Sequence, residues 1–228
     1  MSTAILIPAR YNSSRFPSKM LADLNGKTLI ERVCEKCVQT GFDVYVLTDH
    51  AGIADKFDKG SVIIQSPSES ILNGTERCRH AVQNDSRLEN YTRFINVQGD
   101  MPDITPEIII AVRRLLRDYD VSTAYTNISE QDRKDPNVVK AVVYDDELEW
   151  CGRGFTNGYR HLGVYGYSKH AIKGHYPKNP CSAELRSNLE QLRWLENGMT
   201  IGAAKVLFDG IEINTPEDLE LWRTKNPK

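Results

Sequence analysis

The sequence predicts an α/β fold: a mostly parallel mixed sheet flanked by helices, with a smaller antiparallel extension. Two observations support this prediction. In the first half of the chain, short apolar runs of strand type alternate with segments whose apolar residues recur at helical spacing. In the second half, strand-like runs follow one another without helices between them, which is typical of antiparallel pairing. The 228 residues suit a single domain, with the extension expected around residues 138–180.

The elements of the first half are predicted from hydrophobic periodicity and from helix-start signals. Strands are expected at residues 4–7, 44–48, 62–65 and 94–97, and helices at 28–39, 74–83 and 106–118. Thr105-Pro106-Glu107 and Thr215-Pro216-Glu217 each place a threonine N-cap, a proline and an acidic residue in the order of a helix start. A further helix is therefore expected directly after Thr215.

The second half is expected to contain strands at residues 138–144, 148–151 and 160–167, with a glycine-rich turn at 151–158. One amphipathic helix is predicted over residues 182–196, followed by a strand at 201–207 and a strand end at 211–213. A spacing of six residues would put Glu184 and Glu190 on opposite sides of that helix, so no carboxylate pair is expected there. Glu190 and Arg193 could form an ordinary i, i+3 surface pair.

The composition is that of an ordinary soluble globular protein, with 40% hydrophobic and 26% charged residues. The net charge of −2 argues against nucleic acid as a partner, since nucleic-acid binders normally show a basic excess. The sequence has no apolar run of about 18 residues, so no membrane span is expected. No basic stretch precedes the first strand, so no signal peptide is expected and the predicted location is cytoplasmic.

The five cysteines are scattered along the chain. Cys34 and Cys37 form a CxxC pair, which could indicate a redox or metal site. Both lie on one apolar helical face, and no second CxxC or nearby histidine completes a zinc set. We therefore predict that both sulfurs pack in the core.

A basic loop follows the first strand and is the strongest candidate site. Arg10, Arg15 and Lys19 lie among small and turn-forming residues at the carboxyl end of that strand, where ligands bind in open α/β sheets. The three cations can face one anion such as a polyphosphate, with loop N–H groups as further donors. The loop has no Gly-Lys-Ser/Thr, so it is not a Walker A loop. The alternative is a solvated basic loop, and the loop alone does not decide between them.

Polar residues follow or begin other predicted elements. Asp100 comes just after a buried strand, behind Gly99, which allows close backbone approach. A carboxylate there can hold Mg²⁺, although an aspartate after glycine is also common in turns. The segment 73–77 starts a helix with Arg77 in reach of an anion at the helix start, although Thr75 could simply cap the helix.

The strand predicted at 160–167 has an unusual composition. Alternation places His161, Gly163 and Tyr165 on one face, which leaves room for a ligand beside the glycine. The alternative is a hydrogen-bonded core histidine.

These segments together resemble the 3-deoxy-manno-octulosonate cytidylyltransferases, or CMP-Kdo synthetases. The matching segments are residues 7–11, 17–19, 74–77, 96–100, 161–167, 189–193 and 214–220. They keep the family's order and span nearly the whole chain. The resemblance implies a nucleotide-binding (Rossmann-like) domain in which the anomeric hydroxyl of a 2-keto-3-deoxy sugar acid attacks the α-phosphate of CTP and releases pyrophosphate. It also implies a homodimer that serves lipopolysaccharide or capsule biosynthesis.

The resemblance implies roles for particular residues. Those expected to bind the nucleotide are Pro8, Ala9, Arg10, Arg15, Lys19, Thr75 and Gln98. Those expected on the sugar side are Arg77, His161, Tyr165, Glu190 and Gln191. Arg10, Lys19 and Asp100 are expected to be catalytic, and Asp100 with Asn214 is expected to face the Mg²⁺ cofactor.

The chain also departs from the family pattern. The family usually has a second metal-binding aspartate at the position of Asn214, and the segment between Trp150 and Tyr159 is much shorter here. Cys181-Ser182-Ala183-Glu184-Leu185 replaces the usual Pro-Leu-Glu-His. Two alternatives therefore stay open: transfer to another acidic sugar, such as an amino-Kdo or sialic-type acceptor, and a catalytically weak nucleotide-binding paralogue.

Overall fold

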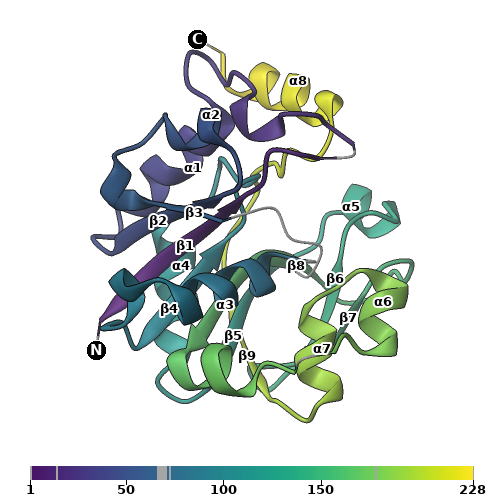
Figure 1. Cartoon of the computed structure of the whole chain (residues 1–228). Helices are drawn as coiled ribbons and strands as arrows, with labels where there is room; N and C mark the ends of the chain where they lie inside the picture. Colours follow the sequence, from purple (N-terminus) through teal and green to yellow (C-terminus); the bar gives the residue numbers. More distant parts are fainter. Residues whose placement is uncertain (1, 14, 66–70, 72, 178, 228) are drawn as a thin grey trace.

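The structure is a computed structural model that describes residues 2–13, 15–65, 71, 73–177 and 179–227. The strands of this described part form one nine-stranded sheet with the order β3-β2-β1-β4-β8-β5-β9-β7-β6 (Figure 1). The strands are β1 (Thr3–Ala9), β2 (Asp43–Thr48), β3 (Val62–Ile64), β4 (Arg93–Val97), β5 (Val121–Thr126), β6 (Lys140–Tyr144), β7 (Glu147–Gly152), β8 (Tyr159–Ser168) and β9 (Ile201–Lys205).

Parallel and antiparallel pairing divide the sheet. β1 pairs in parallel with β2 and β4, and β2 with β3. β8 then runs antiparallel between β4 and β5, while β9 returns parallel to β5. The hairpin of β6 and β7 continues the same sheet at its far edge through β8 and β9. The predicted α/β class, a mixed sheet flanked by helices, is confirmed. Antiparallel pairing is not confined to an extension, because β8 runs antiparallel within the sheet between β4 and β5.

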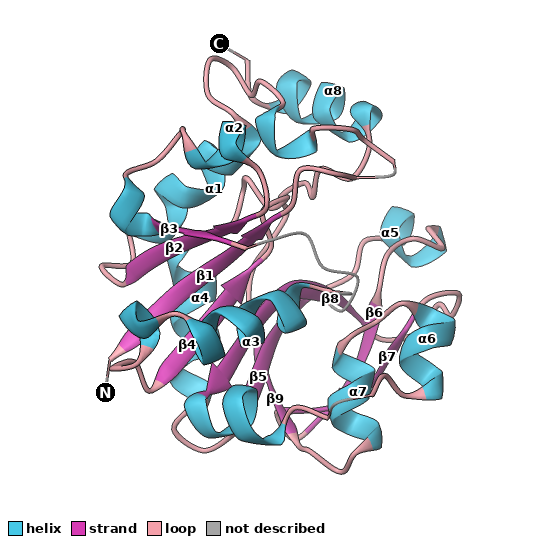
Figure 2. Cartoon of the chain, viewed as in Figure 1, coloured by secondary structure: helices cyan, strands magenta, loops and turns pink. Residues whose placement is uncertain are grey.

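Helices cover both faces of the sheet (Figure 2). The longer helices are α1 (Leu29–Val38), α3 (Gly74–Asn84), α4 (Pro106–Leu115) and α8 (Pro216–Lys225), and the shorter ones are α2 (Ala51–Ala54), α5 (Glu130–Lys134), α6 (Ser182–Ser187) and α7 (Gln191–Glu196). One core joins β1 to α1, α4 and α8, and the other joins the opposite face of β1 to α3 and α7. In the described part of the chain, no helix has the length and apolar character that crossing a bilayer requires.

The spacing of the apolar residues correctly predicted the longer helices α1, α3 and α4. Cys34 and Cys37 are buried and free in the core, as predicted. Two strand predictions were incomplete or wrong: the fully buried β5 was not predicted, and residues 211–213 form no strand. Ile213 makes a single strand-like bond, donating its N–H to the Asp100 carbonyl at 2.9 Å.

The single helix predicted over 182–196 was wrong. Asn188 lies in the left-handed region at φ 51°, and this residue separates α6 from α7. Asparagine tolerates that conformation better than most residues, so the helix can turn there. The break redirects Glu190 and Arg193 into the protein interior, where they are 8% and 0% exposed. The alternative of a Glu190–Arg193 surface pair therefore does not hold.

Candidate active site

After β1 the sheet grows first on one side of this strand and then on the other, and a cavity lies beside this switch point. β2 and β3 extend the sheet on one side of β1, and β4 lies on the other. Such a switch point opens a crevice at the carboxyl ends of the strands. The cavity has a volume of about 210 Å³. Its lining residues are Pro8, Arg10, Ser13, Arg15, Lys19, Met20, Ile71, Asn73, Gly74, Arg77, Gln98, Gly99, Asp100 and Asn214.

Lys19 and Asp100 meet at the centre of this site. The Lys19 side chain is 9% exposed, and its Nζ donates to Asp100 Oδ2 at 2.8 Å. Lys19 begins a short 3₁₀ turn, Lys19–Leu21, which buries its stem. Arg10 and Arg15 are exposed and line the same cavity. The alternative of a wholly solvated basic loop therefore fails for Lys19.

Asp49, directly after β2, fixes the basic loop. The Tyr11 N–H donates to Asp49 Oδ1 at 3.0 Å, and the Tyr11 ring stacks on His50 at 3.7 Å between centroids. Arg77 reaches the other oxygen of Asp49 at 3.4 Å. A single carboxylate thus links the loop after β1 to α3.

Glycines bring the strand ends together. A Cβ on Gly99 would lie 3.0 Å from the Pro8 carbonyl and 2.8 Å from Met20 Sδ, so the predicted close approach is present. A Cβ on Gly74 would lie 2.9 Å from the Gln98 amide, and one on Gly163 would lie 3.2 Å from Gln98 Cγ. Gln98 therefore fills the space between the start of α3 and β8.

Asn214 lies in the cavity wall, as the sequence suggested. Arg15 donates to Asn214 Oδ1 at 3.3 Å, and the backbone N–H of Asn214 donates to Asp218 at 2.8 Å. Asp218 also completes a capping box with Thr215 at the start of α8. The helix start thus holds Asn214 beside the basic loop.

The oxygen donors of the cavity fit a magnesium ion. Asp100 offers a carboxylate and Asn214 an amide oxygen, both hard ligands of the kind Mg²⁺ takes. Among the described residues, no group of three or more His, Cys, Asp or Glu side chains could hold a metal by itself.

The residues expected on the sugar side form a second group, which adjoins the cavity through Gln98. Arg77 lines the cavity itself, whereas His161, Tyr165, Glu190 and Gln191 are buried behind it. His161 Nε2 lies 3.0 Å from Thr123 Oγ1, and the Tyr165 hydroxyl donates to Gln191 Oε1 at 3.1 Å. His161, Gly163 and Tyr165 share one face of β8, as alternation predicted.

Burial changes the protonation of this group. Burial and, to a lesser extent, the charge of Arg153 together lower the pKa of His161 to about 4, so the imidazole is neutral at pH 7. Burial raises the pKa of Glu190 to about 7 against the hydrogen bonds from Thr75, with Glu184 and Glu76 raising it as well. Glu190 therefore changes charge near neutral pH.

The start of α3 differs from the expected free helix terminus. Asn73, rather than Thr75, is the N-cap, accepting from the Glu76 N–H at 2.8 Å. The Thr75 N–H donates to Glu190 at 2.8 Å, and the Thr75 hydroxyl pairs with Tyr167 at 2.6 Å. Four of the residues predicted to bind the nucleotide differ in their position. Pro8 and Gln98 line the cavity, whereas Ala9 and Thr75 are fully buried and do not line it. Two helix-start donors are therefore already occupied.

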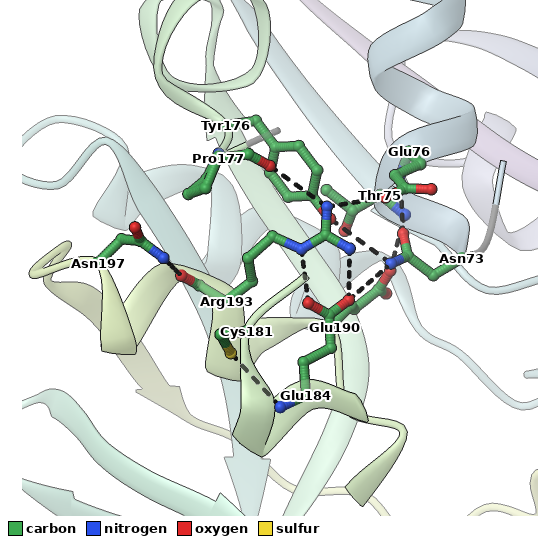
Figure 3. Close-up of polar contacts among 10 residues, drawn as sticks. All are labelled: Asn73, Thr75, Glu76, Tyr176, Pro177, Cys181, Glu184, Glu190, Arg193 and Asn197. Atoms are coloured by element: carbon green, nitrogen blue, oxygen red, sulfur yellow. Dashed lines mark hydrogen bonds and ion pairs between the residues drawn. The ribbon is translucent and has the colours of Figure 1, made fainter. Parts of the chain in front are cut away.

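Figure 3 shows how a buried arginine joins α3 to α6 and α7. Arg193 donates to both oxygens of Glu184, at 2.5 and 2.6 Å, and to Glu76 at 2.7 Å. Its guanidinium also lies over the Tyr176 ring, 4.6 Å from the centroid. The prediction that Glu184 and Glu190 face apart was wrong: the break at Asn188 brings both to the start of α3, where Asn73 donates to Glu184 at 3.2 Å.

Arg153 was missed by the sequence analysis. Its Nε donates to the Asn137 carbonyl at 3.2 Å, and its Nη1 donates to the Ser187 carbonyl at 2.5 Å. Burial lowers its pKa, with the charge of Arg15 lowering it further and Tyr165 opposing, so its guanidinium lies within electrostatic range of Arg15 and Tyr165. The sequence did contain a signal for this residue, because Arg153 is a single arginine within the predicted glycine-rich turn at 151–158.

Comparison with known proteins agrees with this geometry. The family model described as "Cytidylyltransferase" matches residues 4–201. A 3-deoxy-manno-octulosonate cytidylyltransferase of Rickettsia bellii is 37% identical, covering 95% of this chain and 92% of the relative. An 8-amino-3,8-dideoxy-manno-octulosonate cytidylyltransferase of a Shewanella species is 35% identical, covering 96% of each chain.

A solved structure shares the whole architecture. The structure of CMP:2-keto-3-deoxy-manno-octonic acid synthetase complexed with CTP has a TM-score of 0.86 and 28% sequence identity, covering 99% of this chain and 98% of that one. The chain belongs to the cytidylyltransferase family that includes the 3-deoxy-manno-octulosonate cytidylyltransferases.

Proposed function

We propose that this protein transfers CMP from CTP to the anomeric hydroxyl of a 2-keto-3-deoxy sugar acid. The bond formed joins the sugar oxygen to the α-phosphorus, the bond to the β-phosphate oxygen breaks, and pyrophosphate leaves. The observation that supports this most directly is the cavity in which Arg10, Arg15 and Lys19 face Asp100. Phosphoryl-type transfer needs charge neutralisation and positioning more than covalent catalysis, and these residues supply both.

The triphosphate is bound by the loop after β1. Lys19 is buried and pairs with Asp100, whereas Arg10 and Arg15 are exposed, with Arg15 donating to Asn214 Oδ1 at 3.3 Å. Gln98 and the nearby backbone of Pro8 fix the nucleotide at the strand ends, where Gly74 and Gly99 leave space. The buried residues Ala9 and Thr75 shape this wall from behind.

Asp100 and Asn214 would hold Mg²⁺ with the phosphates of CTP. The ion would neutralise charge on the phosphates and on the departing pyrophosphate. Lys19, already within hydrogen-bond distance of Asp100, adds a fixed positive charge at the same place.

The sugar acid is bound on the side of β8. Arg77 and Arg153 supply cations for its carboxylate, and neutral His161 with Tyr165 and Gln191 supplies hydrogen-bonding groups. In the described part of the chain, Gln191 Nε2 and both amide atoms of Asn96 are buried without a partner. Buried polar atoms of this kind are normally paired, so they are suited to a ligand or an ordered water.

The relatives support two acceptor chemistries, since both a Kdo enzyme and an 8-amino-Kdo enzyme match at similar identity. The test is pyrophosphate release from CTP with Kdo, 8-amino-Kdo, a sialic acid and no acceptor, with the CMP-sugar identified by mass. Product with either octulosonate supports the proposal. If no pyrophosphate is released with any of these acids, the alternative of a catalytically weak nucleotide-binding paralogue is favoured. Equal pyrophosphate release from ATP and from CTP would contradict the proposed specificity for CTP.

We propose that the protein is a cytoplasmic homodimer, with the edge hairpin at the subunit contact. Val142, Tyr144 and Trp150 on β6 and β7 are 41%, 75% and 41% exposed and form an apolar edge of the kind that subunits cover. Light scattering with Tyr144→Ser and Trp150→Ser tests this: the mass should fall to that of a monomer. A monomeric wild type would exclude the dimer.

A further inference from the structure

Asn96 of β4 is a buried amide without a partner, and the sequence analysis gave it no role of its own. Its side chain is 0% exposed, and among the described residues neither Nδ2 nor Oδ1 has a hydrogen-bond partner. Buried polar atoms in native proteins are nearly always paired, and an unpaired amide lowers the stability of the fold. The presence of Asn96 in this strand therefore needs a reason other than folding.

The strands on both sides of Asn96 leave its amide available. In the register of the sheet, Leu6 of β1 and Tyr165 of β8 lie directly beside it. Both belong to the core that joins the sheet to α3 and α7. The Tyr165 hydroxyl already donates to Gln191 Oε1 at 3.1 Å. These neighbours leave the amide of Asn96 for a group that comes from outside the chain.

Asn96 lies directly behind the wall of the cavity. Gln98, which follows β4, lines the cavity, and alternation places Asn96 on the same side of the strand, about 7 Å deeper. A Cβ on Gly74 would lie 2.9 Å from Gln98 Nε2 and 3.4 Å from Asn96 Nδ2. Both amides therefore approach the same cavity-lining residue at the start of α3.

The Gln98 side chain separates Asn96 from the cavity. It makes no hydrogen bond within the part of the chain that the structure describes. Gly74 and Gly163 lie on its two sides, and a Cβ on Gly163 would be 3.2 Å from Gln98 Cγ. With no hydrogen bond to hold it and no side chains on these two neighbours, Gln98 can turn aside when a ligand enters. That movement opens a path between α3 and β8 to Asn96.

The chemistry of Asn96 favours a hydroxyl group as its partner. Its amide donates through Nδ2 and accepts through Oδ1, and a hydroxyl group can both accept and donate. A carboxylate only accepts, so it would leave Oδ1 unpaired. Glu190, which accepts from the Thr75 N–H at 2.8 Å at the same helix start, would also repel a carboxylate when it is ionised. The carboxylate of an acidic sugar therefore suits Arg77 in the cavity lining, and a hydroxyl suits Asn96.

We propose that Asn96 is a specificity-determining residue whose amide binds a hydroxyl group of the sugar acid. The inference rests on the proposed function, because the sugar acid on the β8 side supplies this hydroxyl. In the free protein the unpaired amide lowers stability, and binding of the acceptor removes that cost. An acceptor without the hydroxyl leaves the amide unpaired, so the site discriminates against it.

The experiment compares wild type with Asn96→Leu, which replaces the amide by an apolar side chain of similar size. Pyrophosphate release measures the KM for Kdo and the KM for CTP. The KM for Kdo should rise about tenfold through the loss of two neutral hydrogen bonds, whereas the KM for CTP should stay within about twofold. Urea unfolding should show the variant at least as stable as wild type, because it removes a buried unpaired amide. Lower stability with an unchanged KM for Kdo would mean a structural role and would overturn the inference.

Thr3→Val is the matched control, because Thr3 Oγ1 is also buried without a partner among the described residues but lies at the other end of β1 from Pro8. It should leave both KM values unchanged. If Asn96→Leu does not fold, Asn96→Ala is measured in its place, with the same expected KM for Kdo.

Kdo analogues that each lack one hydroxyl then identify the group that Asn96 binds. One analogue should have a raised KM with wild type and no further rise with Asn96→Leu, because both changes remove the same contact. If the variant raises the KM of every analogue as much as that of Kdo, Asn96 binds none of these hydroxyls and the inference is wrong. No pyrophosphate release by wild type with any sugar acid would instead contradict the proposed function.

Discussion

Lys19 is a buried cation that already pairs with Asp100 before substrate binds. It is 7% exposed and pairs with Asp100, so its charge is neither solvated nor free before substrate arrives. A phosphate entering the cavity therefore meets an ammonium group whose position is already fixed, which reduces the ordering cost of binding. Arg10 and Arg15 are exposed, although Arg15 donates to Asn214 Oδ1 at 3.3 Å.

Lys19→Met should weaken CTP binding about tenfold or more. A charged hydrogen bond contributes on the order of 1.5–3 kcal/mol, and the unpaired Asp100 would also repel the phosphates. Isothermal titration calorimetry without metal measures the effect. Lys56→Met removes an exposed lysine and should bind as wild type does. Equal affinities for Lys19→Met and wild type would place the triphosphate elsewhere.

Glu190 should make stability depend on pH near neutrality. Its folded pKa of about 7 lies above the ordinary value of 4.5, so the folded state holds the proton more tightly. The stability from this group is full below pH 4.5 and is lost as the pH rises through 7. The loss approaches about 3 kcal/mol, since one pKa unit corresponds to about 1.4 kcal/mol.

Comparison with Glu190→Gln isolates that contribution, because the amide oxygen can still accept from Thr75. Urea unfolding from pH 5 to 8 should show wild type losing stability relative to the variant. His161, whose pKa is lowered to about 4, destabilises both proteins alike as the pH falls below 6.5. Parallel curves would mean that Glu190 stays ionised throughout.

The location of a site residue could be predicted where the residue follows the end of a strand. Lys19, Asp100 and Gln98 follow β1 and β4, and strand ends at a switch point converge. Arg153 depends on contacts with the distant segments at Asn137 and Ser187, which no local pattern contains. Thr75 fits the local pattern of a helix start, yet tertiary hydrogen bonds to Glu190 and Tyr167 decide its role.

At the scale of elements, the break between α6 and α7 does most to shape the sugar side. The apolar period continues through residues 182–196, so periodicity alone predicts one helix. The left-handed turn at Asn188 instead places Glu184 and Arg193 in one buried ion pair. A single asparagine is too weak a signal for such a break, because asparagine also occurs inside helices.

Arg193→Met should destabilise the fold by about 3–5 kcal/mol, because it leaves Glu184 and Glu76 without their shared cation inside the protein. The exposed arginine of α6 provides the comparison: Arg186→Met should change stability by less than about 0.5 kcal/mol. Urea unfolding at pH 7 measures both. Similar values for the two variants would mean that the buried network adds nothing to the attachment of α7.

At the scale of the molecule, the sheet order exceeds what the sequence could predict. The alternation of strands and helices predicted a parallel sheet, which β1 to β4 form, but it did not predict the order of the strands. The insertion of β8 between β4 and β5 is non-local, since about sixty residues separate β8 from β4 in the chain. Its consequence is functional: β8 carries His161 and Tyr165 next to Gln98, so both halves of the sheet build one site.

Because the site joins distant segments, CTP should stabilise the whole molecule. The loop after β1, the loop after β4, α3 and Asn214 come together only in the folded state. A ligand that binds only that state adds about 2.7 kcal/mol to the unfolding free energy at a hundredfold excess over its Kd. Thermal unfolding should therefore show a higher Tm with CTP than with the same concentration of ATP. Lys19→Met, which weakens CTP binding about tenfold or more, should lose about half or more of the CTP shift at that concentration. Equal shifts with both nucleotides would show that the phosphates alone are recognised, and would contradict a pocket that selects cytosine.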